Sequence, residues 1–462
     1  MLSRLSGLFL VAFSAWFLFL RGLGNAGLLS VDEPRYVWIG RAMAESGDWI
    51  SPRLYGQPWL EKPPLLYWLT ALGWKVGLAD EWAARLPVAI VALAFLALFW
   101  WTLAAEFDTE AATLSSAILA TGAGWLLYSH VAVADLPLAA TFGAAMLMAW
   151  RGWLRWAGVL LGLAVLAKGL VPLVLALPAL WWLRVRWREL VAPLLLACAV
   201  SLPWYLICYQ RHGRQLIDEL FIRHHFARFF DAKAQVLHPQ PFWFYLPVLA
   251  LMLLPWTPLT VAGLRHWADP RLRFFLLWFG FGLLFFSISS GKLPGYVLPL
   301  LPAAAALSGV TAVAAPRQWR ATVAVTAVIL FCLPDARLLG AIAGKLDGIP
   351  LQTGNWLWIG LAASVAAAVL ASSTNYRMIA VSVLSMGGLV YWAGRSADRH
   401  TARPFKTLAA DVCAGEGLHR QWQYGLSYYA VAAVPACQPE SPQRWEATSV
   451  EPGGRLYLRE RK

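Results

Sequence analysis

Apolar runs of about 20 residues, long enough for a helix to cross the hydrocarbon core of a bilayer, recur along most of the 462-residue chain. In lipid a helix satisfies its own backbone hydrogen bonds, which an isolated extended segment cannot do. The composition points the same way, because only 14% of the residues are charged, against about 25% in a typical soluble domain. The sequence therefore predicts an all-α polytopic membrane protein.

Thirteen candidate spans follow from the apolar runs and from the polar or helix-breaking residues that separate them. They are 5–21, 82–105, 111–128, 132–150, 153–167, 169–183, 190–209, 242–263, 271–289, 294–313, 319–334, 355–371 and 376–393. Residues 1–393 thus form the expected transmembrane domain, in which 24–81 and 210–241 are the large polar loops.

Basic residues gather in alternate connections, which places those connections in the cytoplasm by the positive-inside rule. Only the connection 106–110 is acidic. The net charge of +13 is then explained by orientation and by anionic lipid, and we expect no nucleic-acid partner. The basic connections contain Arg4, Arg151, Arg155, Arg184, Arg186, Arg188, Arg265, Arg271, Arg273, Arg317, Arg320 and Arg377.

The other set of connections is expected on the extracytoplasmic face, and it holds most of the remaining polar residues. These are the loop 24–81, Asp135, Lys168, the loop 210–241, Lys292, the loop 335–354 and the tail. The tail, residues 394–462, is polar and has strand-like runs at 426–434 and 455–458, which predicts a small soluble α/β domain. Cys413 and Cys437 lie in this tail and can form a disulfide if the tail is extracytoplasmic.

The stretch 30–68 is the most polar part of the first half of the chain. Ser30 and Glu33 fit a capping box, and the apolar spacing after Asp32 predicts an interfacial helix that Gly47 could end. Asp32 is a candidate general base in a half-dry site. The alternative is that Asp32 and Glu33 only cap the helix.

Three further constellations lie in outward connections. Glu61-Lys62 precedes two prolines that fix a turn, so that Lys62 could meet a phosphate, although the two residues could also form an ordinary surface pair. Asp135 stands in an apolar run without a local partner, which marks either a functional group or a helix N-cap. Lys168 also stands in an apolar run and marks either a functional group or a side chain that extends to the lipid headgroups.

The loop 210–241 is rich in cations and histidines. Arg228 and its neighbours suit a phosphate ligand, and His225 with His238 and a carboxylate could hold a divalent metal ion, whereas the alternative is a basic solvated face. Lys292 and Tyr296, just before a span, suit a phosphate and a substrate hydroxyl, or anchor the chain at the interface.

The residues 32–68 read DEPRYVWIGRAMAESGDWISPRLYGQPWLEKPPLLYW. This stretch resembles the first extracytoplasmic loop of the bacterial 4-amino-4-deoxy-L-arabinose lipid A transferases and their relatives. These proteins belong to the protein O-mannosyltransferase-like group with the GT-C fold. Later motifs resemble that group in the same order: VADLPL, AKGLVP, FIRHHFARF, HPQPFWFYLPVLALMLLPW and SGKLPGYVLPLLPAAA.

The resemblance implies an inverting glycosyltransferase that uses a polyprenyl-phosphate-linked sugar, with undecaprenyl phosphate as the bacterial carrier. By motif match, Asp32 is similar to the catalytic carboxylate and Asp135 to a second acidic residue. Lys62 resembles the ligand of the lipid phosphate, and Glu61 resembles a metal-proximal ligand. Residues that also line the family's site match Arg35, Lys168 and Tyr296. The chain departs from the pattern around His238, where Pro239 follows instead of Arg and Ala234 stands where a histidine would be expected.

We therefore expect transfer of a sugar to an envelope acceptor such as lipid A or another glycolipid, in the inner membrane and on its extracytoplasmic face. Nucleotide sugars are cytoplasmic, so no nucleotide cofactor is expected, and a divalent metal ion is the only candidate cofactor. Two alternatives stay open: transfer to protein, as in O-mannosylation, and a transporter or flippase for a lipid-linked sugar. A transporter should place ionisable residues at mid-membrane between inverted repeats, whereas here they cluster at one face.

Overall fold

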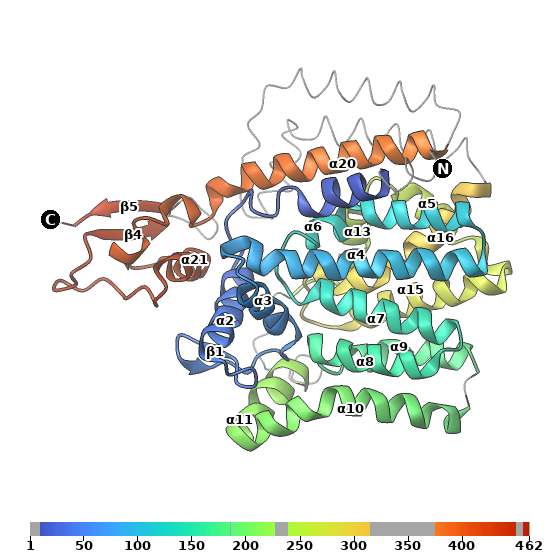
Figure 1. Cartoon of the computed structure of the whole chain (residues 1–462), viewed down its shortest axis with the longest axis horizontal. Helices are drawn as coiled ribbons and strands as arrows, with labels where there is room; N and C mark the ends of the chain where they lie inside the picture. The colour runs from blue at the N-terminus through green and yellow to red at the C-terminus, as the bar shows by residue number, and fades with distance from the viewer. Residues whose placement is uncertain (1–9, 185, 227–238, 315–374, 450–455, 462) are drawn as a thin grey trace.

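The computed structural model describes residues 10–184, 186–226, 239–314, 375–449 and 456–461. Most of these residues lie in helices that run side by side across the molecule (Figure 1). The helices of the bundle are α4 (Asp80–Glu106), α5 (Thr109–Thr121), α6 (Ala123–Tyr128), α7 (Asp135–Trp150), α8 (Leu154–Lys168), α9 (Val171–Trp182), α10 (Trp187–His212), α13 (Tyr245–Met252), α14 (Thr257–Gly263), α15 (Pro270–Ile288), α16 (Leu301–Ala314) and α20 (Asn375–Ala397).

Several of these helices can cross a membrane. Four described stretches are long and apolar enough, namely Asp80–Glu106, Arg188–His212, Pro270–Ile288 and Pro294–Val313, and the pair α13 and α14 makes a fifth if its two members form one span. The prediction of a multi-pass helical membrane protein is confirmed at this level. The number of thirteen spans stays a prediction, and two of them, 319–334 and 355–371, lie outside the described residues.

Two expected spans are broken rather than continuous. The run 111–128 is divided into α5 and α6 at Gly122, whose backbone is extended (φ −65°, ψ 130°). The run 242–263 bends by 115° between α13 and α14. In these two runs apolar residues mark both halves alike, so the apolar pattern does not show the break. By contrast, the boundary expected between the runs 153–167 and 169–183 is present: α8 ends at Lys168, and Gly169 follows with a φ of 81°, which suits glycine.

The bundle packs tightly because small residues stand where helices cross. An added Cβ at Gly158 would lie 2.3 Å from the carbonyl oxygen of Pro193, which brings α8 against α10. One at Gly309 would lie 2.0 Å from Oγ of Ser115, which brings α16 against α5. Small residues at crossings are the usual way in which helices approach closely in membranes.

The first polar loop folds over one end of the bundle. It contains α2 (Asp32–Ser46), the hairpin of β1 (Arg53–Leu54) and β2 (Gln57–Pro58), and α3 (Leu65–Lys75). Gly47 ends α2 in a left-handed conformation with a φ of 74°, as predicted. The predicted capping box of Ser30 and Glu33 is wrong. The N-cap residue is Val31, which makes no side-chain cap, and Ser30 Oγ accepts from the amide of Asp32. Glu33 is instead drawn into a buried ion pair, described below.

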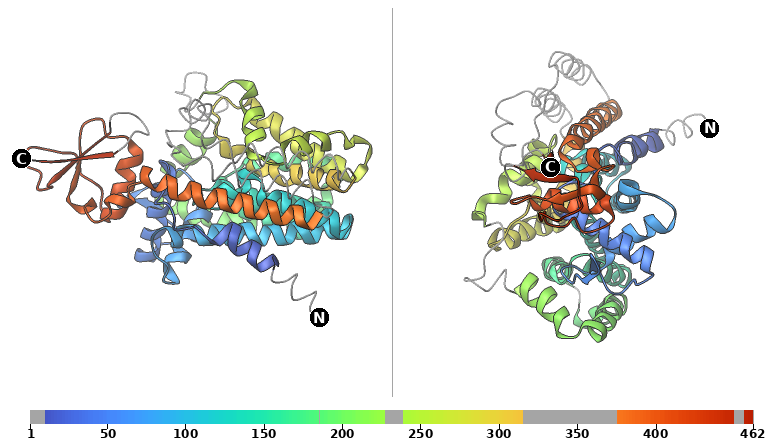
Figure 2. Two further views of the ribbon diagram at one scale, coloured as in Figure 1. Left: turned by 90° about the horizontal axis from the view of Figure 1, so that it is seen from above. Right: turned by 90° about the vertical axis from the view of Figure 1, so that its left-hand side faces the viewer.

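A small mixed sheet follows α20 at the same end of the molecule (Figure 2). Strand β3 (Val412–Ala414) pairs parallel with β4 (Trp445–Ser449), which pairs antiparallel with β5 (Leu456–Glu460). Residues 456–458 of the strand-like run predicted at 455–458 thus lie in β5. The prediction of a strand at 426–434 is wrong, because this run begins within a helix, α21 (Arg420–Ala430). That helix buries Trp422, Leu426 and Tyr429 along one face.

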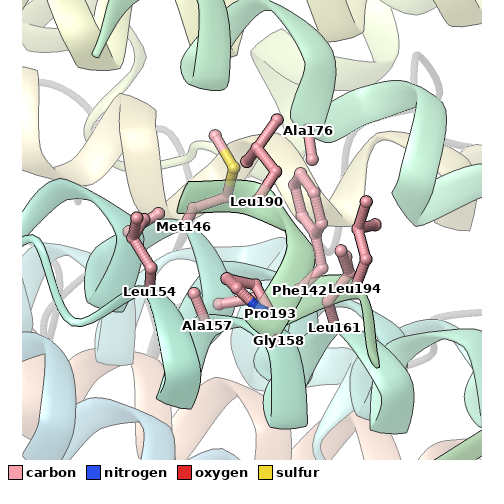
Figure 3. Close-up of a pocket in the computed structure, with 12 residues that line it drawn as sticks. Phe142, Met146, Leu154, Ala157, Gly158, Leu161, Ala176, Leu190, Pro193 and Leu194 are labelled. Carbon is pink, nitrogen blue, oxygen red and sulfur yellow. The ribbon is translucent and has the colours of Figure 1, made fainter. Parts of the chain in front are cut away.

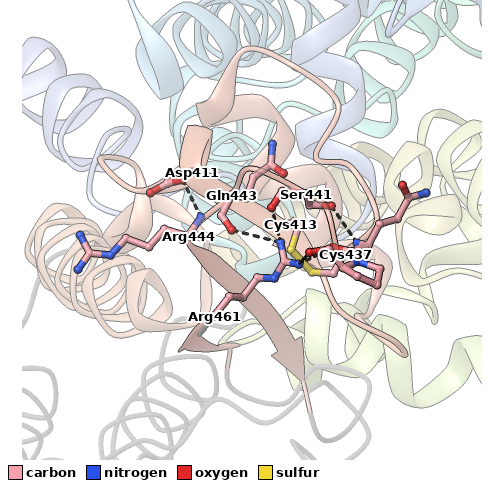
Figure 4. Close-up of a disulfide and its surroundings, with 9 residues drawn as sticks. Asp411, Cys413, Cys437, Ser441, Gln443, Arg444 and Arg461 are labelled. Atoms are coloured by element: carbon pink, nitrogen blue, oxygen red, sulfur yellow. Dashed lines mark hydrogen bonds between the residues drawn. A yellow bond between two sulfur atoms is a disulfide. The ribbon is translucent and has the colours of Figure 1, made fainter.

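Cys413 and Cys437 form a disulfide, which closes the stretch that contains α21 (Figure 4). Arg461, beside β5, donates to the carbonyl oxygens of Ser441 and Gln443 at 2.9 and 3.2 Å, so the segment that follows Cys437 is tied to the sheet. The disulfide and these hydrogen bonds together hold the segment that follows α21 in place.

The opposite end of the bundle is basic. Arg151, Arg271 and Arg273 lie there, next to the acidic connection that broke the charge rule in the sequence. Glu106 of that connection is ion-paired with Arg151, and its carbonyl oxygen accepts from Arg271 at 3.3 Å. The acidic side chain is therefore compensated by the neighbouring basic connections, and the exception does not oppose the predicted orientation.

Candidate active site

The sequence-predicted carboxylates and cations meet at the end of the bundle that carries the first loop. Asp32 begins α2 and forms an ion pair with Arg35 one turn later. Arg35 also reaches Glu61, with 3.5 Å between the guanidinium and carboxylate atoms, and Lys62 lies 3.0 Å from the same carboxylate. The two motifs of the first loop therefore form one network of alternating charge.

Arg35 is the centre of this network and is largely shielded, with 13% of its side chain exposed. Burial alone would lower the pKa of its guanidinium, but the charges of Asp32 and Glu61 outweigh that effect and raise the pKa above its ordinary value. The guanidinium thus stays charged and holds two carboxylates. Asp32 is the most accessible member, with 41% of its side chain exposed, so its carboxylate can still meet a substrate.

A second pair forms where α7 begins and α8 ends. Asp135 at the start of α7 is ion-paired with Lys168 at the end of α8. The ammonium of Lys168 also lies 4.4 Å from the ring centre of Tyr296. Gly295 admits this arrangement, because a Cβ there would lie 2.7 Å from Cγ of Asp135. Three separate sequence motifs are thereby joined.

Tyrosines connect the two pairs. The phenol of Tyr128 interacts electrostatically with both Asp135 and Asp32. Burial, followed by the charges of Asp32 and Glu61, raises the pKa of Tyr36 well above its ordinary value. Burial and then Glu61 do the same for Tyr67, whose buried hydroxyl has no hydrogen-bond partner among the described residues. These phenols therefore stay protonated.

Lys292 is placed differently from the prediction. The residue is 4% exposed, and its ammonium donates to the carbonyl oxygens of Ser289 and, at 3.1 Å, Gln240. Burial lowers its pKa. The segment still reaches the site through Leu293, whose carbonyl accepts from Tyr245 at 3.2 Å, and Tyr245 interacts electrostatically with Asp135. In this arrangement Lys292 orders the backbone beside the site.

The predicted metal ligands are not brought together in the part of the chain that the structure describes. Arg228 and His238 lie outside the described residues, and His225 is described only as backbone in η2 (Ile217–Phe226). No group of three His, Cys, Asp or Glu side chains that could hold a metal occurs among the described residues. Glu61 faces two cations, so the described donor set does not fit a divalent ion.

Sequence reasoning missed a buried ion pair that anchors the site. Arg85 donates from Nε and Nη2 to the two carboxylate oxygens of Glu33 at 2.7 and 2.8 Å, and both side chains are at most 2% exposed. Glu33 also accepts from the amide of Ala132 at 2.8 Å, three residues before Asp135. This carboxylate therefore ties the start of α2 to the start of α7. Arg85 stands near the start of an apolar run, and that position was the available signal.

The cavity in Figure 3 lies away from this chemistry. It has a volume of about 50 Å³ and is bounded by α7, α8, α9 and α10 in the part of the bundle remote from Asp32. Because its lining is apolar throughout, it offers no group for catalysis. The labelled lining residues are Phe142, Met146, Leu154, Ala157, Gly158, Leu161, Ala176, Leu190, Pro193 and Leu194.

The fold and the paired charges at one end of the bundle define a polytopic membrane protein of the GT-C type. The chain belongs to the dolichyl-phosphate-mannose-protein mannosyltransferase family, whose model matches residues 5–266. Among curated proteins it is 35% identical over 336 residues to the undecaprenyl phosphate-alpha-4-amino-4-deoxy-L-arabinose arabinosyl transferase of Pseudomonas paraeruginosa. That alignment takes in 67% of this chain and 60% of the relative, so the match spans less than two thirds of the relative's length.

Solved structures show the same architecture. ArnT from Cupriavidus metallidurans bound to undecaprenyl phosphate matches with a TM-score of 0.75 at 23% identity, over 94% of this chain and 86% of that one. The apo state of the same protein matches with a TM-score of 0.72 at 24% identity, over 96% and 87% of the two chains. These likenesses confirm the predicted GT-C type of fold, and the family resemblance read from the motifs is confirmed with them.

Proposed function

We propose that this protein is an inverting glycosyltransferase that moves a sugar from a polyprenyl phosphate, undecaprenyl phosphate in bacteria, to an envelope acceptor such as lipid A or another glycolipid. The observation that carries the proposal is the pair of carboxylate–cation couples, Asp32–Arg35 and Asp135–Lys168, assembled from distant segments around Tyr128. Ionisable side chains are costly in an apolar bundle, so such a cluster at one end of it marks a functional site.

The proposed donor fits the charges of the site. The curated relative is named for undecaprenyl phosphate-linked aminoarabinose, and the matching ArnT structure binds undecaprenyl phosphate. Lys62 and Lys168, each about 15% exposed, offer partly shielded ammonium groups for a phosphate. A lipid phosphate that enters from the bilayer would meet these cations at the end of the bundle.

The proposed reaction needs one base and stabilisation of one leaving group. Asp32 accepts the proton of the acceptor hydroxyl as its oxygen attacks the anomeric carbon. The bond from that carbon to the phosphate oxygen breaks on the opposite face, and the electron pair stays on the phosphate. Lys62 and Lys168 stabilise the developing charge. Arg35 holds Asp32, and Asp135 orients Lys168.

The proposed site faces the extracytoplasmic side of the inner membrane. The basic end of the bundle, with Arg151 and Arg271, is the cytoplasmic end by the positive-inside rule. The Cys413–Cys437 disulfide lies beyond the other end, and disulfides persist in oxidising compartments. Two independent features thus support the same orientation.

A divalent metal ion bound by Glu61, His225 and His238 is a separate proposal, which the resemblance supports and the described pairing of Glu61 with Arg35 and Lys62 opposes. No step of the proposed reaction uses it. Elemental analysis of the purified protein tests it, with Glu61→Gln as the comparison.

The test is transfer from radiolabelled undecaprenyl-phosphate sugars in proteoliposomes, with envelope extract as acceptor. The donors are aminoarabinose, mannose, glucose and galactose derivatives. Wild type should move label off the carrier, whereas Asp32→Asn should lose at least about 100-fold in rate, as expected on losing a general base. The matched control is Asp269→Asn, since Asp269 pairs with Arg271 at the other end of the bundle.

Each outcome has a meaning. A labelled glycolipid supports the proposed acceptor, and labelled protein replaces it with the O-mannosylation alternative. Label that crosses the bilayer still joined to its lipid would establish the transporter alternative. Normal transfer by Asp32→Asn would show that this carboxylate is not the base.

A further inference from the structure

The C-terminal helix α21 reaches the centre of the charge network. The ring centre of Tyr424 lies 5.4 Å from the guanidinium carbon of Arg35. Trp59 lies at the same distance and Tyr36 at 5.7 Å. The guanidinium that holds Asp32 and Glu61 is therefore enclosed by aromatic rings, and one of those rings comes from the far end of the chain. An aromatic face attracts a cation most strongly where water is partly excluded.

The hairpin of the first loop is built to receive α21. Tyr55 and Gly56 form its two-residue turn, with φ values of 50° and 81°. A tyrosine in the left-handed region is strained, and such strain persists only where surrounding contacts compensate it. The ring of Tyr55 is stacked on Tyr424 with 6.5 Å between ring centres, and its hydroxyl is hydrogen-bonded to Ser427.

Polar contacts fix α21 and its approach in place over the first loop. Tyr429 donates to the carboxylate of Glu81 and accepts from the amide of Leu28. Asp398 accepts from the amide of Gly27 at 2.9 Å, and Lys406 lies 2.6 Å from Asp80. The helix is thus docked at several points, so the position of Tyr424 over Arg35 is set by the fold.

We propose that Tyr424 is a positioning residue of the active site, which holds the Arg35 guanidinium between Asp32 and Glu61 through its aromatic face. The proposal rests on the proposed transferase function and adds to it that the segment after α20 is part of the catalytic apparatus. Tyr424 acts through Arg35 and not on the substrate. Its loss should therefore slow the chemical step and leave donor binding nearly unchanged.

The first experiment compares Tyr424→Leu, Tyr424→Phe and Tyr457→Leu in the proteoliposome assay with the full chain. Tyr424→Leu should lower kcat about tenfold, in keeping with loss of a shielded cation–π contact, with the donor KM unchanged within about twofold. Tyr424→Phe keeps the ring and should retain wild-type kcat. Tyr457 is the control, because it lies on β5 and is 53% exposed.

The second experiment is a double-mutant cycle with Arg35→Gln, which removes the cation. Tyr424→Leu should cost little further in kcat when Arg35 is already replaced, since both changes break one contact. The same cycle on thermal stability in detergent needs no activity and should show coupling of the same sign.

These results separate the two proposals. Wild-type kcat in Tyr424→Leu, additive losses in the cycle, or an equal loss in Tyr424→Phe would each overturn the role of the Tyr424 ring while transfer by the wild type stands. If the wild type transfers no sugar at all, the proposed function fails, and the stability cycle alone decides whether Tyr424 and Arg35 are coupled.

Discussion

Asp32 and Glu33 are adjacent in the chain and have opposite environments. The side chain of Asp32 is 41% exposed and pairs with Arg35 within its own helix. The side chain of Glu33 is fully buried and bonds to Arg85 and to the amide of Ala132. One carboxylate is free to meet a substrate, and its neighbour fixes the backbone that carries it. A helix makes this division natural, because successive side chains point in different directions.

Glu33→Gln should therefore destabilise the protein by about 3 kcal/mol, since it leaves the buried Arg85 charge uncompensated. The measurement is thermal unfolding in detergent, by intrinsic fluorescence. Glu45→Gln is the matched control on the same helix, because the side chain of Glu45 is 59% exposed and pairs with Arg41 one turn away on the helix surface. That change should stay within about 0.5 kcal/mol of wild type. Equal effects of the two substitutions would contradict a structural role for Glu33.

At the residue scale, the sequence identified the charged residues of the site but not the partners with which they pair. Asp32, Arg35, Glu61, Lys62, Asp135 and Lys168 were all singled out and all lie in the two described networks. Their pairing could not be read from one sequence, because Asp135 and Lys168 belong to different helices. Lys292 showed the limit most clearly, since its ammonium is used by backbone carbonyls.

At the scale of elements, a small polar cluster joins the turn after α2 to the end of α10. Asp48 accepts from the amides of Ile50 and Ser51 at 3.0 and 3.1 Å and from Arg211 at 2.7 Å. Partial burial opposes the charged form, but these hydrogen bonds outweigh it and hold the pKa of Asp48 below its ordinary value of 3.8. The cluster thereby fixes the loop between α2 and the hairpin.

A depressed carboxylate pKa gives stability that is present above the unfolded value and is lost as the pH falls through the folded value. Asp48→Asn should thus cost about 1 kcal/mol at pH 7, and the difference from wild type should shrink as the pH falls below 3.8, the ordinary pKa of the group. Thermal stability at neutral pH and at an acid pH well below 3.8 measures it. Asp218→Asn, at a 50% exposed side chain on η2, is the comparison and should show a smaller difference at both values. A difference that persists unchanged in acid would refute the assignment.

Elements were predicted well where the pattern was long and poorly where it was short. The apolar runs at 82–105 and 190–209 correspond to α4 and α10 within a few residues. The run at 426–434 is aromatic and apolar, which favours a strand locally, yet it is mostly helical because Trp422 and Leu426 pack beneath the first loop and the sheet. The breaks at Gly122 and between α13 and α14 depend on packing with other helices, which one sequence does not display.

At the scale of the whole molecule, charge is divided between two ends. The basic connections lie at one end. The paired carboxylates lie at the other end, where Figure 1 shows the first loop and the C-terminal sheet. The fold class was predictable because the lipid environment leaves few choices of structure. The docking of the C-terminal segment on the first loop could not be predicted, because contacts such as Lys406–Asp80 join residues far apart in the chain.

Labelling with an impermeant thiol reagent tests the orientation. Gln57→Cys lies in the exposed hairpin, and Thr109→Cys lies at the exposed start of α5 at the basic end. Each is made with Cys198→Ser, since Cys198 is an exposed free cysteine. Intact spheroplasts should label the first variant, and only permeabilised ones the second. The reverse pattern would place the site in the cytoplasm.

The ring of Tyr424 over Arg35 also bears on how the protein is made. A ribosome delivers the first loop long before it delivers α21, and the disulfide that closes the stretch around α21 forms only where oxidation is available. A nascent chain therefore carries Asp32 and its partners through most of membrane insertion without their last aromatic neighbour. On the proposed function, an unfinished chain transfers sugar more slowly, and full turnover begins only after that late segment has been exported and has docked on the first loop.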